Sequence, residues 1–155
     1  MSNLVELEVK NVALVRTEGG MGMAVILQEK DGSRHLPIIV GPFEGKAISM
    51  ALTGETFSRP LTHDLLHNVI ETLGARVEKV VINDLVDGTF YARLILNHEG
   101  KTYSIDARPS DAIAVALRAG APIFASSTVM DSASEYLPDL GEEEEGWEGG
   151  GELGG

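Results

Sequence analysis

The sequence predicts an α+β fold in which a largely antiparallel or mixed β-sheet of about six strands packs with three main helices. Three observations support this prediction. Segments with the apolar patterns of strands occur in two groups of three. Turns that contain glycine separate the strands within each group. Segments with helical apolar spacing, opened by Pro or Thr and closed by Gly, follow each group.

The first half of the chain contains three predicted strands and two predicted helices. We expect the strands over residues 4–16, 23–28 and 34–40. The sequence Lys-Asp-Gly-Ser around Gly32 is a signal for a hairpin turn. Pro42 favours the start of a helix over residues 43–53, and Gly54 follows its end.

The second predicted helix covers residues 63–73, with Thr62 as its N-cap and Gly74 after its end. At 100° per residue its polar side chains share one arc, and this polar arc should face water, a ligand or another subunit. The polar arc consists of His63, Asp64, His67 and Glu71. The opposite, apolar arc consists of Leu65, Leu66, Val69, Ile70 and Leu73.

The second half repeats the pattern of strands followed by a helix. Strands are expected over residues 76–84, 89–97 and 101–106. A helix should begin near Pro109 and end before Gly120, and its apolar residues on all sides indicate a helix buried on most sides. After it, residues 122–125 fit a short strand or connector and residues 130–137 a short helix.

Composition predicts one folded domain over residues 1–138 and a disordered acidic tail over residues 139–155. The net charge of −12 is concentrated late in the chain, because residues 1–130 carry 15 acidic and 12 basic residues. The tail holds seven acidic residues and seven glycines, too few apolar groups to offset the entropy of ordering. The nearly balanced charge of the remaining chain leaves room for a local basic groove.

The composition also excludes several kinds of site. The chain has no cysteine, so disulfides, cysteine nucleophiles and thiolate zinc sites are excluded, and any metal would need oxygen or imidazole ligands. No run of 18 apolar residues and no signal-peptide pattern occurs, which predicts a cytoplasmic protein without a membrane partner.

Three motifs carry a family resemblance: LPIIVGPFEGKAI at residues 36–48, RPLTHDLL at residues 59–66 and DARPSDAIAVALR at residues 106–118. Over about residues 4–137 the chain resembles bacterial members of the bifunctional nuclease domain family. The resemblance implies an α+β fold that self-associates as a homo-oligomer. It also implies activity on RNA and DNA.

Two pairs of residues are candidates for catalysis. His63 and His67 lie one helical turn apart, so both imidazoles can reach one phosphate, although a solvated helix face or a subunit contact would also explain them. Asp106 and Asp111 flank the turn before the third helix, where both carboxylates could bind one Mg²⁺ or Mn²⁺ ion. Alternatively, Asp111 stabilises the helix start and Asp106 pairs with Arg108.

Candidates for phosphate binding are Arg59, Arg108 and Lys46. The two arginines each precede a proline, which holds their backbone extended. They could instead neutralise carboxylates, as Arg59 with Asp111 or Arg108 with Asp64. Lys46 and Glu44 could border the same cleft, or simply form a solvated helix start.

Two hypotheses of function follow. The first is a nuclease of low sequence specificity that hydrolyses phosphodiester bonds in RNA and DNA with the help of a divalent metal. The second is a non-catalytic homo-oligomeric binding or regulatory module, in which the motifs serve packing and subunit contacts. The low aromatic content of 5% and the absence of a basic stripe favour the second.

Overall fold

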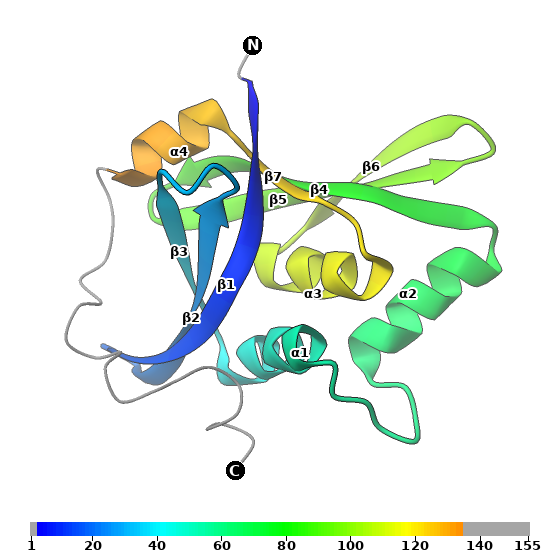
Figure 1. The fold of residues 1–155 in the computed structure, drawn as a ribbon, viewed down its shortest axis with the longest axis horizontal. Helices are drawn as coiled ribbons and strands as arrows, with labels where there is room; N and C mark the ends of the chain where they lie inside the picture. Colours follow the sequence, from blue (N-terminus) through cyan, green and yellow to red (C-terminus); the bar gives the residue numbers. More distant parts are fainter. Residues whose placement is uncertain (1–2, 135–155) are drawn as a thin grey trace.

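A computed structural model of the chain describes residues 3–134. Within this range seven strands form one sheet in the order β3-β2-β1-β7-β4-β5-β6 (Figure 1). The parallel pair is β4 with β7, and the other neighbours are antiparallel. The strands are β1 (Leu4–Thr17), β2 (Gly20–Glu29), β3 (His35–Val40), β4 (Ala75–Val86), β5 (Thr89–His98), β6 (Lys101–Ala107) and β7 (Ile123–Ser126).

The predicted α+β class is confirmed, with seven strands instead of about six. The additional strand, β7, comes from the segment for which the sequence left a strand or a connector open. It joins two three-stranded meanders, because it pairs with β1 on one side and with β4 on the other. Ile123, Ala125 and Ser126 of β7 are buried, as is typical of a strand at the centre of a sheet.

The helices are α1 (Pro42–Thr53), α2 (Thr62–Thr72), α3 (Pro109–Ala119) and α4 (Ser127–Ser134). The three main helices confirm the prediction. The last helix begins at Ser127, earlier than the expected residue 130, because it follows β7 directly. Its expected end at residue 137 and the predicted acidic tail lie outside the described residues. No helix within residues 3–134 is long and apolar enough to cross a membrane.

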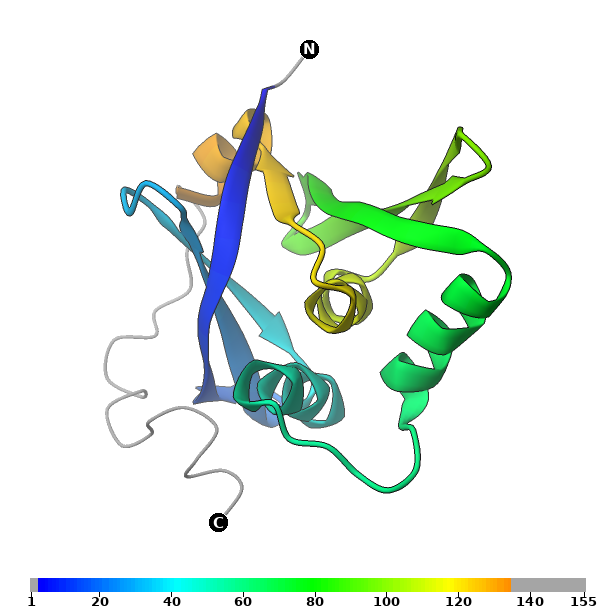
Figure 2. The same cartoon turned by 45° about the vertical axis from the view of Figure 1, so that its right-hand side comes forward.

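Helix α3 lies between α1 and α2 and packs on β4 and β5 (Figures 1 and 2). Residues 112–116 are all buried, as the apolar pattern of this segment predicts. Helix α1 approaches the sheet closely through Gly45, where an added Cβ would lie 2.4 Å from the Met23 sulfur and 2.9 Å from the Met23 Cβ. The first turns of α1 and α3 thereby come close to one another.

Local sequence signals set the ends of these elements. Pro42 and Pro109 occupy the first helical positions of α1 and α3. Gly54 and Gly120 end the same helices in the left-handed conformation, with φ of 75° and 68°. The hairpin turns after β4 and β5 also have positive φ, as the Asp-Gly and Glu-Gly pairs predict.

Candidate nuclease site

A cleft of about 1200 Å³ lies between α1, α2, the start of α3 and the β5–β6 hairpin. Its polar wall includes Glu44, Lys46, His63, Asp106, Arg108 and Asp111. Its apolar wall includes Phe43, Leu65, Leu66, Leu94, Leu96 and Ile105. The three sequence motifs therefore meet at one cleft, although they lie far apart along the chain.

A chain of charged contacts links the three helices at this cleft. His63 Nε2 lies 2.9 Å from Asp111 Oδ1, and Arg108 Nε donates to Asp111 Oδ2 at 2.9 Å. Arg108 Nη1 donates to Glu44 Oε2 at 3.2 Å. Pro109 starts α3 and so places Asp111 in its first turn, where the helix dipole favours a carboxylate.

The protonation state of the His63–Asp111 pair follows from these contacts. Burial raises the pKa of Asp111, but the hydrogen bonds from Arg108 and His63 outweigh it, and the pKa lies below its ordinary value. An ionised carboxylate can only accept hydrogen bonds, so the proton of a neutral His63 ring sits on Nε2. The lone pair of Nδ1 then remains available to take a proton.

Helix α2 is oriented by a second charged contact, between Asp64 and Arg118. Arg118 Nε donates to Asp64 Oδ1 at 2.7 Å, and its other nitrogens donate to the carbonyl oxygens of Ala114 at 2.8 Å and Ala47 at 3.2 Å. Asp64 Oδ2 also accepts the N–H of Leu61 at 3.0 Å, and this bond is the largest cause of the lowered pKa of Asp64. Leu61, not Thr62, is therefore the N-cap of α2.

This contact holds the first turn of the polar arc of α2 against α3. The side chains of His63 and His67 are only 15% and 17% exposed. Of the apolar arc, Ile70 is buried, whereas Leu65, Leu66, Val69 and Leu73 are exposed. Of the polar arc, Glu71 is 60% exposed to water and His63 lines the cleft, as expected of an arc that faces water or a ligand, whereas Asp64 contacts Arg118 of α3.

The structure brings some of the predicted site residues together and leaves others apart. His63, Asp106, Asp111, Arg108 and Lys46 line the cleft. Asp106 is largely exposed there, with Arg93 Nη1 at 3.8 Å from its Oδ1.

Two predicted residues lie outside the cleft lining. His67 Nε2 contacts Glu71 Oε2 at 3.0 Å, so the two histidines do not share a partner. Arg59 is exposed and forms no hydrogen bond or ion pair within residues 3–134.

The charge pairings also differ from the alternatives drawn from sequence. Arg108 pairs with Asp111 and Glu44, and neither with Asp64 nor with Asp106. The partner of Asp64 is Arg118, which the sequence analysis did not single out. Its signal was present, since Arg118 is the one charged residue near the end of an otherwise apolar helix, where a cation with a buried stem needs a partner.

The carboxylates do not fit a divalent cation as they are arranged. Both Asp111 oxygens already have partners, His63 and Arg108, and a cation would have to displace one of them. In the part of the chain that the structure describes, no group of three or more His, Asp or Glu side chains could hold a metal ion. The metal at Asp106 and Asp111 therefore stays a prediction.

The lowered pKa values predict how stability responds to acid. Because the pKa of Asp111 is lower in the folded chain, its contacts add stability above the ordinary aspartate pKa of about 3.9 and lose it as the pH falls through the folded value. We expect the free energy of unfolding to fall less steeply below about pH 4 in Asp111→Asn than in the wild type. Urea unfolding across this range measures the slopes, with Asp87→Asn in an exposed turn as control. Parallel slopes for Asp111→Asn and the wild type would contradict this.

Comparison with known proteins identifies the family. The model of the bifunctional nuclease domain matches residues 25–138. An uncharacterized protein of Mycobacterium tuberculosis is 43% identical over 120 residues, which cover 77% of this chain and 71% of the relative.

Plant relatives match over a smaller share of their length. Bifunctional nuclease 1 of Oryza sativa subsp. japonica is 36% identical over 104 residues, 64% of this chain and 31% of the relative. Bifunctional nuclease 2 of Arabidopsis thaliana is 32% identical over 122 residues, 76% of this chain and 37% of the relative. With the match over residues 25–138, these relatives show that the chain belongs to the bifunctional nuclease domain family.

Proposed function

We propose that this chain is a nuclease of low sequence specificity that hydrolyses phosphodiester bonds in RNA and DNA. The observation that carries the proposal is the His63–Asp111 pair, held by Arg108 on the wall of a cleft. Membership of a nuclease family supports it. Cations that contact phosphate read no base sequence, which agrees with low specificity.

The residues of the cleft have distinct roles in this mechanism. Asp111 holds His63 with its proton on Nε2, and Nδ1 takes a proton from water as the water oxygen forms its bond to phosphorus. The bond from phosphorus to the leaving sugar oxygen then breaks, that oxygen takes a proton from solvent, and the imidazolium returns its proton to solvent.

Arg108 and Lys46 hold the phosphate in this mechanism. Arg108 keeps Nη2 without a hydrogen bond in the described residues, and Lys46 forms no ion pair there. Both cations are thus available to stabilise the charge that develops on the phosphate oxygens. This mechanism uses no metal ion, because both carboxylate oxygens of Asp111 already have partners, His63 and Arg108.

Cleavage of fluorescent single-stranded RNA and DNA by the purified chain tests the proposal. We expect both to be cut, and cutting to continue in EDTA. Cutting that requires Mg²⁺ or Mn²⁺ would contradict the metal-free mechanism and favour the predicted metal at Asp106 and Asp111. If both nucleic acids stay intact with Mg²⁺, with Mn²⁺ and with EDTA, the proposed nuclease activity is contradicted.

A specific observation also supports self-association, the central feature of the alternative non-catalytic module. Helix α2 exposes four large apolar side chains, of which the first two also belong to the apolar wall of the cleft: Leu65, Leu66, Val69 and Leu73. Phe43, on the neighbouring first turn of α1, is 85% exposed. Apolar surface gathered in this way is typical of protein interfaces. We propose that two copies of the chain cover this face for each other.

A charge placed on this face should separate the copies. Val69→Glu would bury an unpaired carboxylate in the interface, so we expect a mass of one chain at concentrations where the wild type has the mass of two or more. Sedimentation equilibrium measures it. Val86→Glu is the control, because Val86 is also 45% exposed but lies at the end of β4. Equal masses for Val69→Glu and the wild type would contradict the proposed interface.

A further inference from the structure

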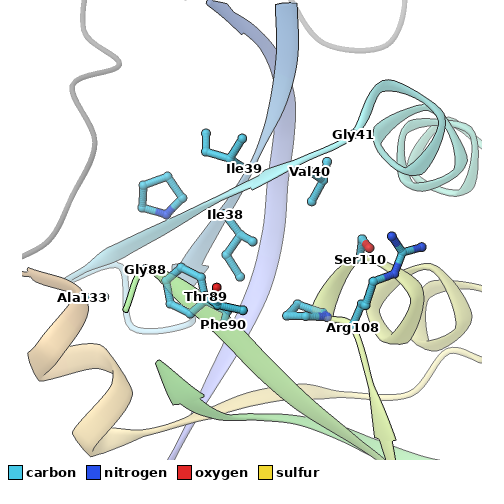
Figure 3. A pocket seen from close by; sticks show the side chains of 12 residues that line it. Ile38, Ile39, Val40, Gly41, Gly88, Thr89, Phe90, Arg108, Ser110 and Ala133 are labelled. Atoms are coloured by element: carbon cyan, nitrogen blue, oxygen red, sulfur yellow. The ribbon is translucent and has the colours of Figure 1, made fainter. Parts of the chain in front are cut away.

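A second cavity, of about 550 Å³, shares Arg108 with the cleft (Figure 3). It is bounded by β3 and the residue that follows it, Gly41, by the turn between β4 and β5, by the first turn of α3 and by Ala133 of α4. Arg108 is the one described residue that lines both the cavity and the cleft. The volume of the cavity lies within the range of about 300–1,000 Å³ that is typical of pockets for small ligands.

One end of this cavity has the chemistry of an anion site. Ser110 lines it, is only 6% exposed, and its hydroxyl forms no hydrogen bond within the described residues. A buried hydroxyl without a partner is costly, so it points to a ligand that supplies an acceptor. Arg108 adds a cation, and the first turn of α3 has no side-chain cap on its N–H groups.

The rest of the cavity is apolar. Pro37 and Ile38 of β3 are buried and line it, and Phe90 of β5 contributes a half-buried ring. Figure 3 shows Ile38 and Phe90 on one side of the cavity, and Arg108 and Ser110 on the other. A ligand that fills it therefore carries a negative charge at one end and a flat or apolar group at the other.

We propose that this cavity binds one nucleoside monophosphate unit, with its phosphate on Arg108 and Ser110 and its base against Phe90 and Ile38. Stacking on an aromatic ring tolerates every base, in agreement with a site that reads no sequence. If the chain cleaves nucleic acid as proposed above, Arg108 lies between this unit and the phosphate that is attacked by the water molecule that His63 deprotonates.

Calorimetric titration of the full chain with 5′-AMP, adenosine and inorganic phosphate tests the cavity. We expect 5′-AMP to bind more tightly than either fragment. Phe90→Ala should weaken 5′-AMP roughly 5- to 100-fold by loss of stacking. Ser110→Ala should weaken 5′-AMP and phosphate, but leave adenosine unchanged. Tyr91→Ala is the control, because Tyr91 is the next residue of β5 and does not line the cavity.

The outcomes separate this inference from the proposed nuclease activity. His63→Ala should keep 5′-AMP binding, since His63 lines only the cleft. If 5′-AMP binding depends on Phe90 but the chain cuts neither RNA nor DNA, the proposed nucleotide site is supported and the proposed nuclease activity is contradicted. If 5′-AMP does not bind, or if Phe90→Ala and Tyr91→Ala lose equal affinity for it, the proposed nucleotide site is contradicted even if cleavage is observed.

Discussion

His63→Ala should lower the rate of RNA and DNA cleavage by about 10²- to 10⁴-fold, the usual contribution of a general base. In the proposed mechanism the imidazole takes the proton from the attacking water, and the contact with Asp111 fixes its tautomer. Alanine removes the proton acceptor but keeps the contact between Asp64 and Arg118 that orients the helix. Initial rates on fluorescent oligonucleotides measure the effect, together with the unfolding midpoint to show that the variant is folded.

Three further variants make this result specific. Asp111→Asn should cause a loss of similar size, and the double variant with His63→Ala should lose little more, because the two residues act as one unit. His98→Ala, at the end of β5 and outside the cleft lining, should leave the rate unchanged. If His63→Ala cuts at the wild-type rate, the cleavage comes from a contaminating nuclease or from other residues, and the proposed mechanism is contradicted.

His67→Ala tests whether both histidines take part in cleavage. The sequence predicts that both histidines act on one phosphate, whereas His67 contacts Glu71 and does not line the cleft. We expect His67→Ala to cut at close to the wild-type rate. A loss as large as that of His63→Ala would show that the two histidines act together.

Arg118→Ala should destabilise the fold by on the order of 3 kcal/mol, the largest effect on stability that we expect of a single charged residue here. The Arg118 side chain is only 10% exposed and ties α3 to α2 through Asp64 and to α1 through the carbonyl oxygen of Ala47, and it also donates to Ala114 within α3. Alanine leaves these acceptors without their donor. Urea unfolding at neutral pH measures the change in the free energy of unfolding.

Two controls show whether the loss comes from this buried fork of hydrogen bonds. Arg93→Ala removes an exposed arginine that contacts Ser104 and Asp106, and should change stability by less than about 0.5 kcal/mol. Arg118→Lys keeps the charge but loses the planar guanidinium group. Its loss in free energy of unfolding should therefore fall between those of Arg118→Ala and Arg93→Ala. Equal stability of Arg118→Ala and Arg93→Ala would contradict the structural role of Arg118.

The sequence by itself determined the fold class, the ends of most elements and the family. Its signals at these points are local. Proline at the first helical position and glycine after the last residue bias the backbone of their own turn, as at Pro109 and Gly120. The apolar pattern of residues 112–117 likewise required a buried helix whatever surrounded it.

Only the tertiary structure decided how the elements face each other and which charges pair. The pattern of α2 separates a polar arc from an apolar one, but the contact of Asp64 with Arg118, 54 residues away, is what holds the start of that arc against α3. The same fold directs His63 to Asp111 and leaves His67 with Glu71. The pairings of His63 with Asp111 and of Asp64 with Arg118 join residues far apart in the chain, and the spacing of residues along one helix carries no information about them.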